Sequence, residues 1–95
     1  MKSIRIYKAL SNETRLQILE WLKNPKEHFA EVYNDGVCVS DIQKKAQLSQ
    51  STVSQYLSIM QRTGLIQATR KGQWTYYKRN EENIKKIKEQ ILNDL

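Results

Sequence analysis

The side chains best suited to recognition chemistry are the serines and glutamines of the segment 50–62. Apolar residues recur there at i, i+4 and i+7, a spacing that predicts a helix with one buried face. Gln50, Ser51, Ser54 and Gln55 then fall largely on the opposite, outward side. A glutamine amide can form two hydrogen bonds to adenine, and a serine hydroxyl can reach several base edges. We therefore predict that these four side chains read base edges in the DNA major groove; an ordinary polar surface is the alternative.

The positive charge of the chain is concentrated around this segment. The 95 residues carry 16 Lys and Arg against 10 Asp and Glu, a formal net charge of +6. No acidic residue occurs from Ile42 to Asn80, so the excess positive charge falls in that block. A basic block rich in uncharged Ser, Thr and Gln is typical of a nucleic-acid-binding surface. A solvated basic face with no nucleic-acid partner is the alternative.

Residues around the predicted reading face are expected to contact the DNA backbone. Arg70 and Lys71 precede Gly72 and fall at the tip of a predicted hairpin, from which they can reach phosphate or the minor groove. Lys44 and Lys45 belong to the preceding helix, where they either lie along flanking phosphates or form a solvated face. The full set of predicted backbone and wing contacts is Lys44, Lys45, Thr52, Tyr56, Arg70, Lys71 and Gln73.

The chain lacks the residue combinations of an enzyme or a metal site. Cys38 and His28 are its single cysteine and its single histidine. Structural zinc sites need about four such donors, and nucleophilic catalysis needs a nucleophile paired with a base. We therefore expect no catalytic residue, no metal ligand and no cofactor. Redox sensing by Cys38 stays open, because it depends on the exposure of the thiol.

The remaining pattern predicts the elements that position these side chains. The expected helices and strands, in order, are helices at 4–10, 12–23, 41–46 and 50–62, strands at 65–69 and 74–77, and a helix at 80–95. The residues 37–39 form a short apolar run that favours β structure. Ser11 and Asn80 are the expected N-caps of the second and last helices. The segment 25–36 has the weakest secondary-structure pattern. Within it, Phe29, Val32 and Tyr33 fit one amphipathic turn.

These elements define the predicted fold class. A short connection between 41–46 and 50–62 predicts a helix-turn-helix, and the hairpin that follows makes it winged. The expected protein is mainly α with a small β-hairpin, in the order α-α-α-α-β-β-α. The length suits a single domain over 1–95, and we expect it to be a winged-helix DNA-binding domain.

The two ends of the chain are expected to form a dimer interface. The last helix carries an apolar stripe that looks too long for so small a core, and small domains often gain stability by pairing. The expected interface residues, from helices within 4–23 and 80–95, are Ile4, Tyr7, Leu10, Ile84, Ile87 and Ile91. A homodimer also suits DNA recognition, because a single small helix reads few bases.

The sequence gives no sign of a membrane or an export route. No apolar run approaches the roughly 18 residues that a bilayer span requires. Met1 to Arg5 is not followed by the apolar stretch of a secretory signal. One cysteine cannot form an internal disulfide, which fits a reducing compartment. We expect a cytoplasmic protein with no membrane partner.

Three motifs in this order resemble the ArsR/SmtB family of bacterial repressors. The segment from Leu10 to Leu19 resembles the family's opening signature, and 48–57 resembles its recognition helix. Gly64-Leu65-Ile66 followed by 70–77 resembles its wing, so the resemblance extends over residues 4 to about 92. It implies a homodimeric winged-helix repressor that pairs through its first and last helices. It also implies double-stranded DNA as the partner, bound at an inverted-repeat operator.

The chain departs from the metal-sensing members of that family. Their third-helix site reads Cys-Val-Cys-Asp-Leu, whereas this chain has Cys38-Val39-Ser40-Asp41-Ile42. The last helix also has no histidine for the family's other site. We expect zinc, nickel, arsenite and cadmium to leave DNA affinity nearly unchanged, and the sequence does not identify an inducer. Tyr56 replaces the family's usual histidine, and the segment 24–36 is longer than the usual connection.

Two other functions remain as alternatives. A winged-helix module can contact protein or RNA, with the basic block as a nonspecific surface. A bare electrostatic patch would favour Lys and Arg on 50–62, so its Ser and Gln side chains favour base reading. A redox-responsive regulator acting through Cys38 is the other alternative.

Overall fold

The computed structural model describes residues 3–95 and contains six helices and three strands within that range. In chain order these elements are α1 Ile4–Leu10, α2 Glu13–Lys23, α3 Pro25–His28, β1 Val37–Cys38, α4 Val39–Ala46, α5 Gln50–Arg62, β2 Ile66–Lys71, β3 Trp74–Arg79 and α6 Glu81–Asp94. The predicted fold class, mainly α with a winged helix-turn-helix, is confirmed.

Helices α4 and α5 form the helix-turn-helix. The predicted range of α5, 50–62, agrees with the structure. Between the two helices Gln47 adopts a left-handed conformation with φ 55°, and Ser49 caps α5 by accepting a hydrogen bond from the Thr52 backbone N–H. Helix α4 begins at Val39 rather than at Asp41, because Cys38 ends the extended segment and takes the N-cap position.

The wing belongs to a three-stranded antiparallel sheet rather than to an isolated hairpin. Its strand order is β1-β3-β2, with β1 pairing Val37 to Tyr77 and Cys38 to Tyr76. Strands β2 and β3 pair from Ile66 with Arg79 to Lys71 with Trp74. Strand β2 therefore begins one residue after the predicted start, and both strands end two residues beyond the predicted ends. Arg70 and Lys71 consequently lie on β2 itself, and Gly72 and Gln73 form the turn.

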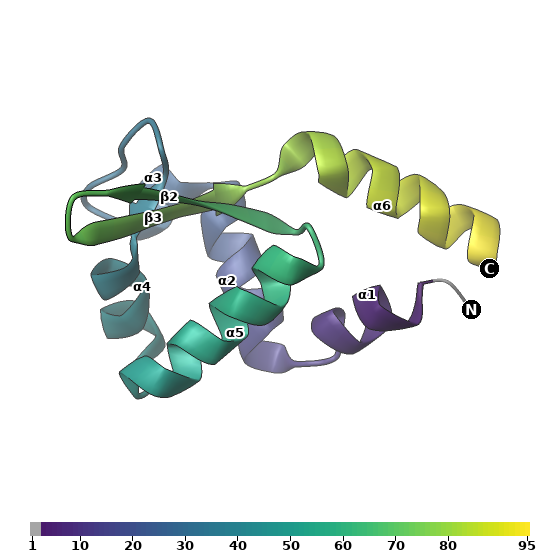
Figure 1. The fold of residues 1–95 in the computed structure, drawn as a ribbon, viewed down its shortest axis with the longest axis horizontal. Coiled ribbons are helices and arrows are strands. Elements are labelled where there is room, and N and C mark those ends of the chain that lie inside the picture. The colour runs from purple at the N-terminus through teal and green to yellow at the C-terminus, as the bar shows by residue number, and fades with distance from the viewer. Residues whose placement is uncertain (1–2) are drawn as a thin grey trace.

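The core gathers beneath the sheet and between α2, α4 and α5 (Figure 1). Its buried apolar residues are Ile6, Ala9, Ile18, Leu19, Leu22, Phe29, Val37, Ile42, Val53, Leu57, Met60, Leu65, Ile66, Ile84 and Ile87. Every helix and strand except the four-residue α3 and the wing strand β3 contributes a residue to this set. Ile84 and Ile87 of α6 therefore belong to the core of the chain itself.

Two local predictions are wrong. Asn12, not Ser11, caps α2, because its extended backbone lets the side-chain carbonyl accept from the Arg15 N–H at 2.9 Å. Phe29, Val32 and Tyr33 do not form one amphipathic turn. Pro25 instead starts the short helix α3, Phe29 is extended and buried, and Tyr33 forms an isolated bridge with Gly36.

Helices α1 and α6 lie at the opposite end of the molecule from the tip of the wing (Figure 1). The Tyr7 hydroxyl donates to the Asp94 carboxylate at 3.4 Å and connects the two helices.

Asn80 caps α6 by accepting from the Asn83 backbone N–H, as predicted. Within residues 3–95, no helix combines the length and apolar character needed to cross a membrane.

Candidate nucleic-acid interface

Helix α5 presents an exposed polar stripe. Val53, Leu57 and Met60 are buried beneath it, which fixes the rotation of the helix about its axis. The four residues predicted to read bases are all exposed: Gln50, Ser51, Ser54 and Gln55. Ser51, Ser54 and Gln55 are spaced i, i+3 and i+4, a spacing that places side chains on one side of a helix. The structure therefore brings these side chains together on one outward face that carries no charge in its first turn.

The start of α5 is stiffened by hydroxyl groups. The Ser49 hydroxyl accepts from the Thr52 N–H at 3.2 Å and donates to the Thr52 hydroxyl at 2.8 Å. It also lies 3.2 Å from the Ser51 hydroxyl. This hydrogen-bond network includes Thr52, one of the residues predicted to contact the DNA backbone, and it fixes the first turn of α5. Ser49 is absent from the predicted site, although a serine directly before a helix is a known capping signal.

Tyr56 packs under an arginine that the sequence did not single out. The Arg15 guanidinium lies 5.3 Å from the centroid of the Tyr56 ring. The same guanidinium donates to the carbonyl oxygens of Ala9 at 2.7 Å and Lys8 at 2.9 Å. Arg15 thus joins the end of α1 to α2 and α5. The sequence carries no signal for these contacts, because Arg15 of α2 meets partners from two other elements, α1 and α5.

The two cations at the wing tip differ in how far their charge is compensated. Arg70, Lys71 and Gln73 are all exposed. Lys71 forms an ion pair with Asp35, and the hydrogen bond and charge of that carboxylate raise the pKa of Lys71. The Arg70 Nε donates to an uncharged acceptor, the Gly72 carbonyl oxygen, at 3.3 Å. Arg70 therefore presents more uncompensated positive charge to a phosphate than Lys71 does.

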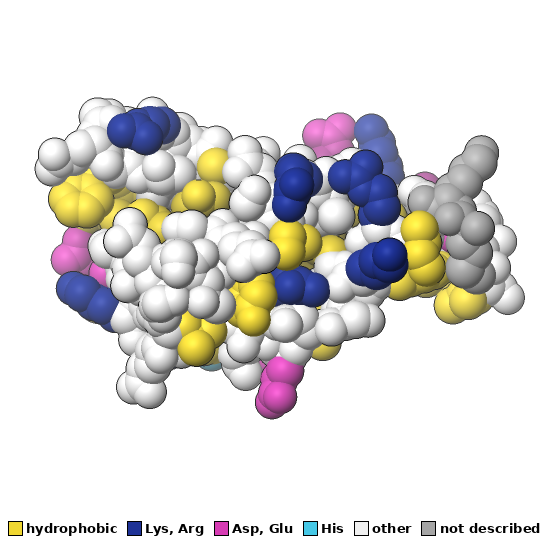
Figure 2. Space-filling view, turned by 60° about the horizontal axis from the view of Figure 1, so that its bottom comes forward, with side chains coloured by type: hydrophobic (Ala, Val, Ile, Leu, Met, Phe, Trp, Pro, Cys, Tyr) yellow, Lys and Arg dark blue, Asp and Glu magenta, His cyan; other side chains and the backbone are white. Residues whose placement is uncertain are grey.

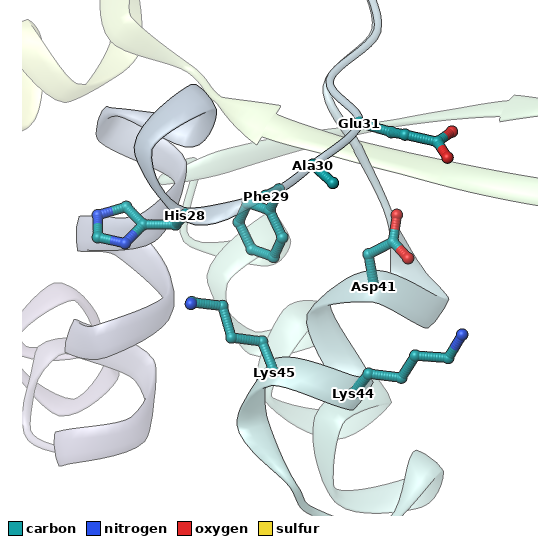
Figure 3. A pocket seen from close by; sticks show the side chains of 7 residues that line it. All are labelled: His28, Phe29, Ala30, Glu31, Asp41, Lys44 and Lys45. Atoms are coloured by element: carbon teal, nitrogen blue, oxygen red, sulfur yellow. The ribbon is translucent and has the colours of Figure 1, made fainter.

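Lys44 and Lys45 point in different directions from α4 (Figure 3). The Lys45 ammonium lies 5.2 Å from the centroid of the Trp21 ring and 5.8 Å from that of Phe29. These cation–π contacts direct Lys45 toward α2 and α3. The Lys44 side chain extends to the other side and is exposed. Lys45 thus has a packing role that the sequence did not indicate, and the structure does not place its ammonium with the α5 stripe.

A hollow of about 320 Å³ lies between α3 and α4. His28 and Asp41 stand on opposite sides of it, with Phe29 between them (Figure 3). Across the described residues, no three His, Cys, Asp or Glu side chains lie close enough together to hold a metal ion. Cys38 is buried, and its Sγ lies 3.4 Å from the Ser40 hydroxyl.

The residues predicted for dimerisation divide into two groups. Ile84 and Ile87 are only 7% and 6% exposed, because they pack into the core of the chain. Ile4 is 48% exposed, and Tyr7, Leu10 and Ile91 are half-buried. The most exposed apolar side chains of the C-terminal end are Leu92 and Leu95, at 77% and 88%. The apolar surface that the chain leaves uncovered here is therefore at Ile4 and the last turn of α6.

The arrangement of α4, α5 and the β2–β3 hairpin defines a winged helix-turn-helix protein of the DNA-binding class. Residues 12–68 match the family model described as bacterial regulatory protein, arsR family. The chain therefore belongs to the ArsR family of bacterial transcriptional regulators. Regulators of this family are DNA-binding proteins rather than enzymes, in agreement with the expectation from sequence.

Known proteins resemble the chain over most of its length. An uncharacterized HTH-type transcriptional regulator of Bacillus subtilis, YbzH, is 51% identical over 100% of both chains. The structure of HlyU from Vibrio cholerae matches with a TM-score of 0.65 and 30% identity, over 92% of this chain and 85% of that one. A homodimeric winged helix-turn-helix domain from Mycobacterium bovis matches with a TM-score of 0.67 and 29% identity, over 95% and 76%.

Proposed function

We propose that the chain is a repressor that binds an inverted-repeat DNA operator as a homodimer. The observation that carries the proposal is the exposed stripe of uncharged hydrogen-bonding side chains on α5. Gln50, Ser51, Ser54 and Gln55 have the donors and acceptors to distinguish base pairs in the major groove, whereas lysines there would read mainly phosphate. Their helix is held rigidly by its buried face and its capped first turn.

The DNA-backbone contacts proposed around this stripe are polar or charged side chains at its edges and at the wing tip. Arg70 and Gln73 at the wing tip would reach the phosphates or minor groove beside the recognition helix. Lys44 would lie along the flanking strand, and Lys71 contributes less because Asp35 partly compensates it. Thr52 and Tyr56 support the helix while lying at its edge. Lys45 is left out of this surface because its ammonium lies over aromatic rings.

Repression follows if the operator overlaps a promoter, because a bound dimer then excludes the polymerase. The V. cholerae relative HlyU is described as a transcriptional activator, so related proteins differ in the sign of regulation. Selection of bound fragments from a random DNA pool would give the operator sequence. A reporter gene placed behind that operator should be less active with the protein than without it; an increase would make the protein an activator.

Gln55→Ala tests base reading directly. We expect the substitution to weaken operator binding by about 1–3 kcal/mol and to relax the preference at one base position, because it removes a bidentate partner. Fluorescence anisotropy with the selected operator and with single-base variants measures both effects. Gln61→Ala is the matched control, since Gln61 is exposed but lies about 120° around the same helix from Gln55.

Arg70→Ala provides the contrast for this prediction. Removing a cation that neutralises one phosphate in each protomer should weaken binding to all sequences alike. Because a dimer loses two such contacts, the slope of log affinity against log salt should fall by about 1.8. Should Gln55→Ala instead reduce affinity equally for operator and random DNA, the assignment of base reading to Gln55 is wrong.

The proposed dimer interface is the uncovered apolar surface at the ends of the chain. Ile4, Tyr7, Leu10 and Ile91 border it, and Leu92 and Leu95 extend it. Ile84 and Ile87 support it from within the core rather than by direct contact. The M. bovis relative, whose fold is the same, is described as homodimeric.

Leu92→Asp is expected to convert the dimer to monomers, because it places a charge on an apolar contact that is 77% exposed in the single chain. Sedimentation equilibrium measures the change in mass, and circular dichroism checks that the helices persist. Lys86→Asp is the control, since Lys86 is exposed and lies about 120° around α6 from Leu92. A molar mass that stays that of the dimer in the Leu92→Asp variant would place the interface elsewhere.

A further inference from the structure

A second basic surface lies beside α5, on the side toward α1. A hollow of about 250 Å³ separates α1 from the last turn of α5, and Arg5, Lys8, Ile59, Arg62 and Thr63 line it. None of these residues belongs to the predicted contact set. Their place between two elements far apart in the sequence explains why no motif indicated the surface.

The lining of this hollow carries three cations. Arg5, Lys8 and Arg62 are exposed, and among the described residues no carboxylate lines the hollow. The ion pairs found among residues 3–95 lie elsewhere, at Lys71 with Asp35 and Arg79 with Glu81. Ile59 and Thr63 are half-buried and form the floor. Three positive charges around a partly apolar floor create a local field that attracts an anion.

Arg62 continues the stripe of α5 that carries the predicted base-reading residues. It follows Gln55 by seven residues and Ser51 by eleven, and both spacings return to nearly the same side of a helix. The Arg62 Nε also donates to the Ser58 carbonyl oxygen at 3.4 Å, one turn back along α5. At 1.5 Å per residue, Arg62 lies roughly 10 Å beyond Gln55, a distance close to the major-groove width of about 12 Å.

The face that includes α5 shows the same distribution of charge. In the central part of this face Lys and Arg side chains surround exposed hydrophobic atoms, and the acidic side chains visible among the described residues lie toward its edges (Figure 2). Arg15 holds this arrangement together, because its guanidinium joins the Lys8 carbonyl oxygen to the Tyr56 ring of α5. The helix α1, which carries Arg5 and Lys8, is therefore tied to the recognition helix.

We propose that Arg5, Lys8 and Arg62 bind DNA backbone phosphate on the side of α5 opposite the wing. The proposal rests on the proposed function, since it assumes that α5 enters a major groove. The wing then holds the phosphates at one edge of the bound segment, and this second surface holds those at the other. Clamping at both edges would fix the tilt of α5 in the groove.

Salt dependence of DNA binding tests the proposal. A triple variant R5A/K8A/R62A is compared with wild type by anisotropy on a mixed-sequence duplex of about 30 base pairs over a range of salt concentrations. The slope of log affinity against log salt should fall by about 0.9 for each phosphate that the variant no longer neutralises, hence by about 2 to 5 for a bound dimer, which carries each cation twice. The control K23A/K26A/K86A removes the same charge from exposed positions elsewhere and should change the slope much less.

The outcomes separate this proposal from the proposed function. Wild-type protein that binds no duplex would contradict the proposed function itself. Wild-type binding with equal slopes for the two triple variants would overturn the phosphate surface alone, provided that sedimentation shows an unchanged oligomeric state. If inorganic phosphate at constant ionic strength raises the melting temperature of wild type but not of R5A/K8A/R62A, and the DNA slope is unchanged, the hollow binds free phosphate and the DNA assignment is wrong.

Discussion

Replacing Gly36 by alanine is expected to destabilise the fold by about 3 kcal/mol or more. Gly36 has φ 111°, a conformation that residues with a Cβ rarely adopt, and it is buried against β3. An added Cβ would collide with the Tyr77 carbonyl group and lie 2.9 Å from the Lys78 Cβ. The backbone of β3 cannot yield without breaking its pairing with β1 or β2. Thermal unfolding followed by circular dichroism should show a melting temperature lower by roughly 10 °C or more.

Gly72→Ala is the matched control for this prediction. Gly72 also has a left-handed backbone, with φ 61°, but no described atom lies within 4 Å of the Cβ that alanine would add. Only the backbone strain remains, which costs about 1–2 kcal/mol. Equal losses of stability for the two variants would mean that strain alone acts at Gly36 and that its approach to β3 is unimportant.

Ile87→Asp is expected to destabilise the chain by about 4 kcal/mol or more, because it places a carboxylate in the apolar core. Ile87 is 6% exposed and belongs to the same buried cluster as Leu57 and Met60. Since a domain of this size has about 5–14 kcal/mol of stability, much of the population should unfold under mild conditions. Urea titration at a fixed protein concentration measures the decrease in stability.

Two further variants separate core from interface on α6. Ile87→Val keeps the site apolar and should cost only about 0.5–1.5 kcal/mol. Leu92→Asp should preserve the helix content and alter the mass, because Leu92 is exposed in the single chain. A folded, monomeric Ile87→Asp variant would show that Ile87 contacts a second copy and would contradict its assignment to the core.

The segment 29–36 connects α3 to the sheet and contacts the wing. Asp35 pairs with Lys71 near the wing tip, and the Lys78 ammonium donates to the Asn34 carbonyl oxygen at 3.3 Å. The Tyr33 hydroxyl donates to the Glu31 carboxylate, and this hydrogen bond raises the pKa of Tyr33 to about 12. This segment therefore holds the wing from the side that faces away from α5.

The sequence by itself determined the elements whose signals are local. The apolar spacing of α5 sets both its bounds and the outward side of Gln55, because a helix repeats every 3.6 residues. The Asn80 cap and the glycine turn of the wing likewise depend on neighbours in the chain. The exposure of the predicted base-reading residues follows from these local rules together with one buried face.

Only the tertiary structure decided which partner each side chain meets. The third strand of the sheet, the place of Lys45 over aromatic rings and the link from Arg15 to Tyr56 all join residues distant in sequence. The apolar stripe of α6 could not show where core ends and interface begins, since Ile87 and Leu92 are equally apolar. That boundary depends on which turns of α6 pack into the core of the chain, as Ile84 and Ile87 do. Such packing is long-range, and no local pattern encodes it.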